Sequence, residues 1–356
     1  MQNPNMDLSH LRKKIDGLDA RIIELLNDRA AITLSIGHEK IKNKKPIYAP
    51  EREQDVLKRI KRLNSGPIKN EAVEAIYREI MSASLALEKP LRIAYMGPEA
   101  TFSHLASLKK FGSSVGHVAC DNVAEVFSKV EGGDCDYGVV PIENSIEGVV
   151  THTMDLLVES DLKICSQVLL DVAHHLMSKA SLAQIKEVYS HPQVLGQCRQ
   201  WLMKNMPKAH LIPVVSTTKA AQMVANKKNA ACIASEVAAS LYGLTILKKN
   251  IQDSAHNITR FLVISNVDVP PTGSDRTSLV FSIKDKVGAL HAMLTPFMKH
   301  KINLTKIESR PSKKKAWDYY FFVDCEGHQS DPQVARALAQ LEGMCKFLKI
   351  LGSYPA

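Results

Sequence analysis

Two short polar clusters interrupt apolar, strand-like stretches of the chain and carry residue types that a small-molecule site needs. One spans residues 141–145 (Pro-Ile-Glu-Asn-Ser), and the other spans residues 257–261 (Asn-Ile-Thr-Arg-Phe). Carboxylate, amide, hydroxyl and guanidinium groups at strand ends can bind and orient a buried ligand. We therefore expect one site to contain Glu143, Asn144, Ser145, Thr259 and Arg260.

The stretch around these clusters, residues 91–268, alternates between strand-like and helix-like patterns. This rhythm predicts parallel α/β sheets, whose ligands lie at the carboxyl ends of the strands. Ser190 ends the strand expected at residues 187–190 and Gln197 follows it, so both lie near the edge where a ligand is expected. Because the stretch is long for one open sheet, two lobes with a cleft between them are expected.

Residues 7–42 show the pattern of one long helix. Its apolar side chains recur at alternating spacings of three and four, as in a coiled-coil seam. Arg29 occupies a seam position, where a charge is costly unless it meets a counter-ion or a ligand. Shorter helices are expected over residues 51–63 and 70–88, with Asn70 as an N-cap. Three helices of such unequal length cannot cover the seam, so we expect the first helix to pair with a second copy of the chain.

Several charged residues on these helices are placed to bind a small dianion. Arg29 and Lys40 share a helix face and lie about 16 Å apart along the axis. Arg12 lies about 26 Å from Arg29 on another face, so it can reach the same ligand only from a second chain. The candidate site is completed by Arg52, Glu53, Ser84 and Glu88 on the following helices.

A linker that contains Pro-Pro-Thr-Gly-Ser, residues 269–276, precedes the last segment, residues 277–356. This segment is predicted to form a βαββαβ order, which is typical of a ferredoxin-like α+β domain. The run Lys313–Lys315 is expected to be a hairpin loop. The elements expected are strand 277–283, helix 287–300, strands 302–309 and 317–325, helix 332–342 and strand 346–351.

The composition excludes several classes of protein. The 356 residues are 45% hydrophobic and 23% charged, as expected for a globular chain of two or three domains. No apolar stretch approaches the roughly 18 residues of a membrane span, and the N-terminus lacks signal-peptide features, so we expect a cytoplasmic protein without a membrane partner. The seven scattered cysteines predict reduced core thiols rather than a metal site. The net charge of +9 comes from dispersed lysines, so no nucleic-acid partner is expected.

The helical segment resembles, over about residues 6–90, the helical class of chorismate mutase. The resemblance implies that Arg12 of a partner chain, Arg29 and Arg52 hold the two carboxylates of chorismate. Lys40 and Glu88 would address the ether oxygen, and Glu53 would bind the ring hydroxyl. This pericyclic rearrangement depends on positioning and electrostatics and needs no nucleophile. Some members of the family carry Gln in place of Glu88 and Asp in place of Ala49.

Residues 91–268 resemble the prephenate dehydratase domain, whose fold resembles type II periplasmic binding proteins with the active site between two lobes. The resemblance implies that prephenate loses CO2 and hydroxide to give phenylpyruvate, without a cofactor because aromatisation drives the reaction. Thr259 would donate toward the leaving hydroxyl, and Arg260 would help to hold a carboxylate. A threonine hydroxyl is a weak acid on its own, so we expect Glu143 to support it.

Residues 277–356 resemble the ACT domain of phenylalanine-regulated dehydratases. The resemblance implies feedback inhibition by phenylalanine bound between paired ACT domains. The three segments in this order resemble the bifunctional chorismate mutase–prephenate dehydratases of phenylalanine biosynthesis, as a homodimer or a larger homo-oligomer. The residues that carry the ACT resemblance, and that are assigned to the phenylalanine site, are Gly288, Ala289, Leu290, Glu308, Ser309 and Arg310.

Two alternative functions stay open. A binding-protein-like fold joined to an ACT domain could sense an amino acid or another solute without catalysis. The pattern of mutase residues and the complete site around Thr259 argue against this alternative. The enzyme could also prefer arogenate to prephenate, although a fused mutase, which makes prephenate, favours prephenate.

Overall fold

The computed structural model describes residues 7–254, 256–283, 286–312 and 319–356. The loop expected at Lys313–Lys315 and the expected start of a strand at Trp317 lie outside these residues. The chain divides into two compact units. One takes Met1–Ala49, Asp55–Leu91 and Phe111–Gly116, and the other takes Pro50–Gln54, Arg92–Lys110 and His117–Ala356.

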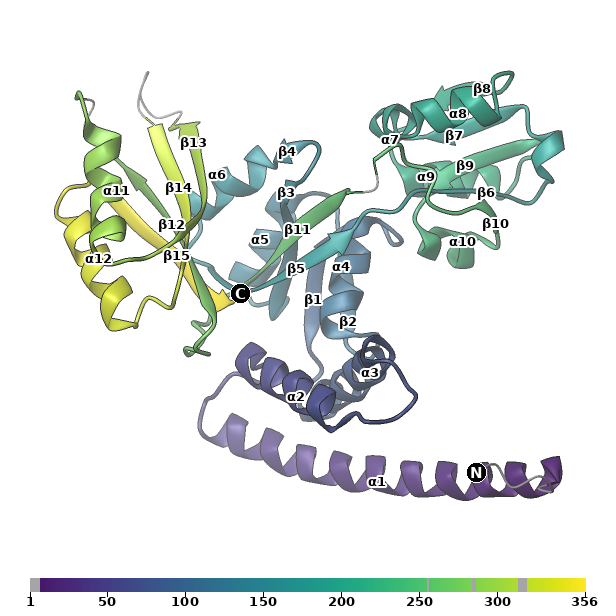
Figure 1. Cartoon of the computed structure of the whole chain (residues 1–356), viewed down its shortest axis with the longest axis horizontal. Helices are drawn as coiled ribbons and strands as arrows, with labels where there is room; N and C mark the ends of the chain where they lie inside the picture. Colours follow the sequence, from purple (N-terminus) through teal and green to yellow (C-terminus); the bar gives the residue numbers. More distant parts are fainter. Residues whose placement is uncertain (1–6, 255, 284–285, 313–318) are drawn as a thin grey trace. The chain divides into compact units, whose positions relative to one another are not determined.

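The helical part of the chain consists of α1 (Leu8–Lys42), α2 (Pro50–Leu63) and α3 (Asn70–Glu88), shown in Figure 1. These bounds agree with the predicted helices to within one residue. The proline at the start of α2 suits a first turn, because its missing amide donor has no intrahelical partner there. The predicted cap of α3 was wrong. Lys69 precedes the helix, and the Asn70 side chain instead accepts a hydrogen bond from Asn64.

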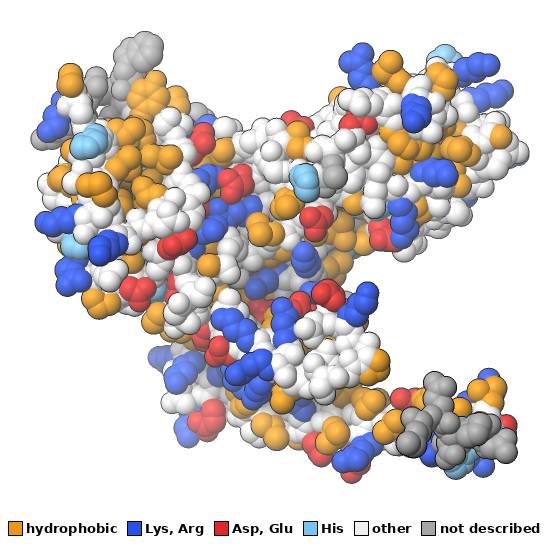
Figure 2. All heavy atoms as spheres, in the orientation of Figure 1, with side chains coloured by type: hydrophobic (Ala, Val, Ile, Leu, Met, Phe, Trp, Pro, Cys, Tyr) orange, Lys and Arg blue, Asp and Glu red, His pale blue; other side chains and the backbone are white. Residues whose placement is uncertain are grey.

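The apolar seam of α1 is exposed in the single chain. Leu18 is 59% exposed and Ile32 is 63% exposed, and orange apolar side chains are visible along the helix in Figure 2. A contiguous apolar stripe of this length is typical of a surface that another surface covers.

The first lobe of the dehydratase-like segment is a sheet in the order β2-β1-β3-β11-β5, with β4 (Gly148–Val149) paired to β3. The prediction of a parallel sheet holds for β1 and β3, but β11 runs antiparallel to both of its neighbours. The antiparallel strand is the return of the chain from the second lobe. The bounds are β1 Arg92–Met96, β2 Gly116–Cys120, β3 Tyr137–Asn144, β5 Lys163–Asp171 and β11 Ile258–Ser265, with helices α4 Phe102–Phe111, α5 Val123–Glu131 and α6 Thr151–Glu159.

The second lobe is a separate sheet in the order β10-β6-β9-β7-β8. Strands β7, β8 and β9 are parallel, as predicted, whereas β6 and β10 are antiparallel additions. The chain enters this lobe after β5 and leaves it before β11, so two connections join the lobes (Figure 1). The bounds are β6 His175–Ser178, β7 Glu187–Ser190, β8 His210–Pro213, β9 Ala230–Ala234 and β10 Thr245–Lys248, with helices η1 Leu182–Gln184, α7 Pro192–Gln197, α8 Arg199–Asn205, α9 Thr217–Val224 and α10 Glu236–Tyr242.

The last segment forms a sheet in the order β13-β14-β12-β15, with α11 and α12 on one face (Figure 1). This arrangement confirms the predicted βαββαβ order. Apolar side chains from both helices pack with those of the sheet, for example Phe297 and Leu338 with Phe281. The bounds are β12 Asp275–Ser282, α11 Ala289–Lys299, β13 Leu304–Pro311, β14 Tyr319–Glu326, α12 Pro332–Glu342 and β15 Phe347–Pro355.

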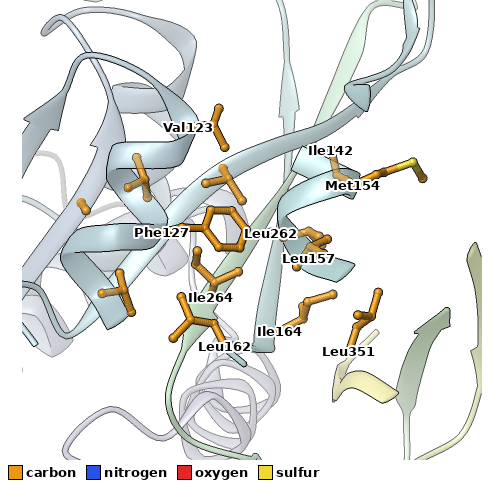
Figure 3. Close-up of a cluster of buried hydrophobic side chains, with 14 of the residues drawn as sticks. Val123, Phe127, Ile142, Met154, Leu157, Leu162, Ile164, Leu262, Ile264 and Leu351 are labelled. Carbon is orange, nitrogen blue, oxygen red and sulfur yellow. The ribbon is translucent and has the colours of Figure 1, made fainter. Parts of the chain in front are cut away.

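The other face of this last sheet shares a hydrophobic core with the first lobe. Leu351 of β15 lies in the same cluster of buried side chains as Leu157 and Ile164 (Figure 3). The backbones also approach closely, because a Cβ atom on Gly352 would lie 2.2 Å from the carbonyl oxygen of Ile164. The sheet and the lobe are therefore packed as one body rather than tethered by the linker alone.

The remaining expectations from composition concern thiols and surface charge. Every cysteine is buried except the half-buried Cys345, as the sequence predicts for core residues. Basic and acidic side chains intermingle over the face seen in Figure 2. None of the helices in the described part of the chain is long and apolar enough to cross a membrane.

Replacing Gly37 with Ala should destabilise the helical unit. The added Cβ would lie 3.1 Å from the Cα of Glu88, which is backbone and cannot move aside, so we expect a loss of about 1–3 kcal/mol. Gly17→Ala in the same helix is the matched control, because nothing lies within 4 Å of its Cβ position, and it should stabilise α1 by about 0.5–1 kcal/mol. Unfolding of both variants measured by scanning calorimetry checks this, and equal stability would contradict it.

Candidate active sites

A pocket with a volume of about 340 Å³ lies between the two lobes. This size is within the range of small-molecule sites. Its polar wall joins residues of the two expected clusters to residues of the second lobe. The polar residues of its lining are Thr101, Asn144, Glu147, His174, His191, Gln193, Gln197, Ser216, Thr217, Asn257 and Thr259.

The side chains of Asn144 and Thr259 are bonded to each other in the pocket. The Asn144 Oδ1 accepts from the backbone N–H groups of Ile146 and Glu147, at 2.9 and 3.0 Å, which fixes the orientation of the amide. Its Nδ2 therefore points the other way and donates to Thr259 Oγ1, at 2.8 Å. Since the Thr259 oxygen accepts this bond, its own hydrogen is free to be donated to a ligand.

A chain of amides extends from this pair to a buried histidine. The Asn144 Nδ2 also donates to Asn257 Oδ1 at 2.7 Å, and the Asn257 Nδ2 donates to Gln197 Oε1 at 3.3 Å. The same Gln197 oxygen lies 2.8 Å from Nε2 of His174, and the Gln197 Nε2 donates to Glu147 at 2.8 Å. The structure thus brings Asn144, Gln197 and Thr259 together, as expected.

His174 is a pocket residue that the sequence reasoning missed. It is 1% exposed, and burial lowers its pKa, so the ring is neutral at pH 7. Because Gln197 takes the proton on Nε2, the Nδ1 is an acceptor, and it has no hydrogen-bond partner among the described residues. The signal in the sequence was the pair His174-His175, two adjacent ionisable residues that follow a largely apolar stretch.

The carboxylates of a substrate would meet neither a lysine nor an arginine among the described residues of this pocket. Helices α4 and α9 begin at the pocket, next to Thr101 and Ser216, and Ser216 caps α9 by accepting from the Lys219 N–H at 3.0 Å. Free amides at helix N-termini and their positive dipole ends can bind anions, so neutral donors can take the place of the expected guanidinium.

Arg260 and Glu143 lie on the opposite face of the sheet from the pocket. The strand register pairs Thr259 with Asn144 and Arg260 with Glu143, and successive residues of a strand point to opposite faces. Arg260 is 6% exposed and forms ion pairs with Glu143, at 2.9 Å, and with Asp324, at 2.7 Å. The expectations that Arg260 holds a substrate carboxylate and that Glu143 supports Thr259 therefore do not fit, since Asn144 provides the support.

Ser145 and Ser190 hold the backbone of the site rather than line the pocket. The Ser145 hydroxyl donates to the carbonyl of His256, at 3.0 Å, and accepts from the N–H of Ile258, at 2.9 Å. Ser190 is fully buried and donates to the carbonyl of Ile233, at 2.7 Å. Both were expected to line the site. In the structure they bond to backbone groups next to the pocket instead.

Four of the residues expected in the helical site meet between α1 and α3. Arg29 donates to the hydroxyl of Ser84. Lys40 forms an ion pair with Glu88, at 2.7 Å, and also donates to the carbonyl of Ile47, at 2.7 Å. Helices α1 and α3 can approach closely here because a glycine, at position 37, faces Glu88.

The other residues expected in the helical site are Arg12, Arg52 and Glu53. Arg12 is exposed on α1, and Arg52 is exposed in the first turn of α2. The Glu53 carboxylate forms an ion pair with Lys110, at 2.8 Å, with both side chains largely buried. A ring hydroxyl would therefore share Glu53 with Lys110, which the sequence did not indicate.

The residues expected to bind phenylalanine occupy a helix start and an edge strand. Gly288 precedes α11 with a φ of 76°, a left-handed conformation that favours glycine. Ala289 is buried and Leu290 is 37% exposed. Glu308 and Ser309 lie on β13, which is at the edge of its sheet.

Arg310, the last of these residues, contacts the first lobe. Its guanidinium bonds through two nitrogens to the carboxylate of Asp155 on α6. This bond raises the pKa of Arg310, so the side chain is a fixed cation. The structure thus places Arg310 in an ion pair, where the sequence predicted a ligand contact.

Known sequence families match the chain in three successive parts. Models of chorismate mutase type II, prephenate dehydratase and the ACT domain match residues 11–89, 93–269 and 277–343. These matches and the fold define a prephenate dehydratase domain flanked by a chorismate mutase domain and an ACT domain. A protein of Aquifex aeolicus (strain VF5), named bifunctional chorismate mutase/prephenate dehydratase, is 51% identical over 354 residues, which cover 98% of each chain. The chain belongs to the family of bifunctional chorismate mutase/prephenate dehydratases.

Solved structures resemble the second unit. Prephenate dehydratase from Arthrobacter aurescens, crystallised in complex with L-Phe, has a TM-score of 0.70 and 32% identity over 75% of this chain and 90% of that chain. GqqA, described as a quorum-quenching acylase, has a TM-score of 0.69 and 30% identity over 74% of this chain and 98% of that chain.

Replacing Asn144 with Asp should lower the dehydratase kcat by about 100-fold. The near-isosteric carboxylate cannot donate to Thr259, so the hydroxyl would turn its hydrogen toward the carboxylate and away from the ligand. Asn122→Asp is the matched control, because Asn122 only caps α5 through its Oδ1, a role that Asp performs equally well. Steady-state assays of prephenate consumption check this, and a similar kcat for both variants would refute it.

The stability of the chain should fall as the pH falls through about 6.5. Burial lowers the pKa of His104, His174 and His175 below their usual value of 6.5. As the pH falls the unfolded state therefore binds protons first, which reduces the free energy of unfolding. Urea midpoints at constant ionic strength between about pH 8 and pH 5 measure this effect. His175→Asn, which keeps an acceptor for the Asn250 amide, should flatten the dependence, and a constant wild-type midpoint would contradict it.

Proposed function

We propose that this chain catalyses two consecutive reactions of L-phenylalanine biosynthesis, from chorismate to prephenate and from prephenate to phenylpyruvate. Membership of the bifunctional family and the three matched domains support this proposal. The mutase occupies residues 1–90, the dehydratase residues 91–268 and the ACT domain residues 277–356, after a linker at 269–276. The protein works in the cytoplasm as a homodimer or a larger homo-oligomer, without a cofactor or a metal.

The bond from Asn144 to Thr259 is the observation that carries the dehydratase assignment. When the bond between the ring and its carboxylate breaks, the carboxylate leaves as CO2 and its electron pair moves into the ring. The ring then expels its hydroxyl group, which takes the proton of Thr259 and leaves as water. The amide of Asn144 stabilises the charge that develops on the Thr259 oxygen, and solvent returns the proton afterwards.

Neutral groups bind the carboxylates of prephenate in this proposal. The first residues of α4 and α9 line the pocket, and the proposed donors are their backbone amides and the Ser216 hydroxyl. The Thr101 hydroxyl is already engaged, because it donates to the carbonyl of Met96 at 3.1 Å. Such donors hold an anion without neutralising it as an ion pair would. This is an advantage for a carboxylate that must lose CO2, because a tight ion pair would stabilise the ground state more than the transition state.

The mutase site uses the cations between α1 and α3. Lys40, held by Glu88 and the Ile47 carbonyl, is placed to stabilise the ether oxygen as its bond to carbon breaks. Arg29, held by Ser84, is placed to bind a carboxylate. Arg12 completes the site from the partner chain, since the exposed seam of α1 is the surface through which two copies pair.

Phenylalanine inhibits the dehydratase by binding to the ACT domain in this proposal. The relative crystallised with L-Phe supports this regulation. Gly288 allows close approach of the backbone to the ligand, and the exposed edge of β13, which carries Glu308 and Ser309, is available to a paired ACT domain.

Acyl transfer, the activity named for one of the similar structures, fits the pocket less well. It requires a nucleophile bonded to a base. His174, a potential base in the wall, is bonded to the Gln197 amide and not to a hydroxyl. The Ser216 oxygen is engaged in capping α9.

The first test supplies the purified chain with chorismate alone, with and without phenylalanine. We expect prephenate to appear briefly, phenylpyruvate to accumulate, and phenylalanine to suppress only the second step. Prephenate that accumulates unprocessed would refute the dehydratase, and unchanged chorismate would refute the mutase.

A second test isolates the role of Thr259. Thr259→Val removes the hydroxyl at constant shape and should lower the dehydratase kcat by a factor of about 100 to 10,000. Thr259→Ser keeps the hydroxyl and should retain most of the rate. Thr259→Ser is also the control for folding, because the mutase site lies in the other compact unit. Near-wild-type dehydration by Thr259→Val would refute the assignment.

A further inference from the structure

A network of four charges, of which three are largely buried and Glu143 is 31% exposed, lies directly behind the catalytic pair. On the face of the sheet opposite the pocket, Arg260 bonds to Glu143, and Lys306 bonds to the other oxygen of the same carboxylate. Arg260 also pairs with Asp324. Two cations and two anions thus neutralise each other in a region of low solvent exposure, where such interactions are strong.

This network joins the first lobe to three strands of the ACT sheet. Lys306 lies on β13, Asp324 on β14, and Tyr354, whose hydroxyl accepts from Arg260 at 2.7 Å, lies on β15. Ser278 on β12 bonds to both Asp324 and Tyr354, at 2.5 and 2.6 Å. Every strand of the ACT sheet therefore contributes to the surroundings of one guanidinium.

The strand that carries Lys306 is also the strand assigned to phenylalanine. In β13, the residues at 306, 308 and 310 share one face. Lys306 bonds to Glu143, and Arg310 bonds to Asp155 of α6. A shift of β13 on ligand binding would consequently move the bonding partners of two side chains of the first lobe, Glu143 and Asp155.

In the first lobe, two of the residues that bond to the ACT sheet are the direct sequence neighbours of residues in the pocket. Glu143 and Arg260 are opposite each other in the register, and the adjacent pair, Asn144 and Thr259, faces the pocket. The two pairs are consecutive in the antiparallel ladder, so they are joined by one peptide unit on each strand. A displacement of Arg260 or Glu143 therefore rotates or shifts the pair on the other face, where a misplacement of about 1 Å can cost about 100-fold in rate.

We propose that Arg260 and Glu143 are positioning residues that hold the Asn144–Thr259 pair for catalysis, and that Lys306 and Asp324 transmit the phenylalanine signal to them. This inference rests on the proposed dehydratase role of Thr259. In this proposal Arg260 does not touch the substrate. It acts on the pocket through Thr259, its neighbour on β11. The four-charge network would then couple phenylalanine binding on the ACT domain to the dehydratase pocket.

Kinetics of Arg260→Lys test the positioning role. The lysine keeps the charge but cannot bond to Glu143, Asp324, Gln167 and Tyr354 together. We expect the dehydratase kcat to fall by about 10- to 100-fold with KM changed by less than about threefold. A KM raised by about tenfold at unchanged kcat would show that Arg260 binds substrate and would overturn the inference, even if Thr259→Val confirmed the role of Thr259.

Lys306→Met tests the transmission, with Lys349→Met as its matched control. Lys349 also connects the ACT sheet to the first lobe, through the carbonyls of Val158 and Ser160, but has no contact with the four-charge network. Calorimetry should show that phenylalanine binds both variants within about threefold of the wild type. At saturating phenylalanine, Lys306→Met should retain at least about fivefold more dehydratase activity than the wild type, and Lys349→Met should not.

Three outcomes decide between the explanations. Full inhibition of Lys306→Met with phenylalanine bound would overturn the transmission, as would equal loss of inhibition in both lysine variants. Relief of inhibition in Lys306→Met alone supports it. Calorimetric binding of phenylalanine reports whether the ACT sheet of each variant is folded, because the mutase site lies in the other compact unit. A failure of Thr259→Val to lose activity would refute the proposed function separately.

Discussion

The alternation of side chains along β11 is the constraint on which the second unit depends. A strand presents successive residues to opposite faces, so Thr259 and Arg260 cannot serve the same pocket. Thr259 lines the pocket between the lobes, and Arg260 bonds to Asp324 of the ACT sheet. The strand therefore belongs to the candidate active site and to the contact with the ACT sheet at once.

Both candidate sites rely on side chains that are fixed by their neighbours before a ligand arrives. The Asn144 amide is oriented by two backbone donors, Gln197 is held by His174 and Glu147, and Lys40 is held by Glu88. Neither reaction requires a covalent intermediate, so prior orientation and electrostatics are the main means of lowering the barrier. The protein can thus use amides and hydroxyls where other enzymes use a nucleophile and a base.

The sequence predicted the helices and strands well. It predicted less well to which side of a strand each residue points. Periodicity defined α1, α2 and α3 to within one residue and gave the βαββαβ order of the ACT domain. Clusters at strand ends found Asn144, Gln197 and Thr259. The same clusters suggested Arg260 and Glu143 because adjacency in sequence was taken for adjacency in space. His174 and the Lys110 partner of Glu53 depend on contacts between distant segments, which no local pattern contains.

The close approach of Gly352 to Ile164 restricts how this enzyme can change over evolutionary time. Any side chain at position 352 would meet the backbone of β5, and backbone cannot be repacked as a side chain can. The ACT domain is consequently fitted to this particular lobe and is not an interchangeable module. A lineage could lose regulation by deleting the domain, but it could not acquire a new effector by exchanging the domain for another without rebuilding the strand against which it packs.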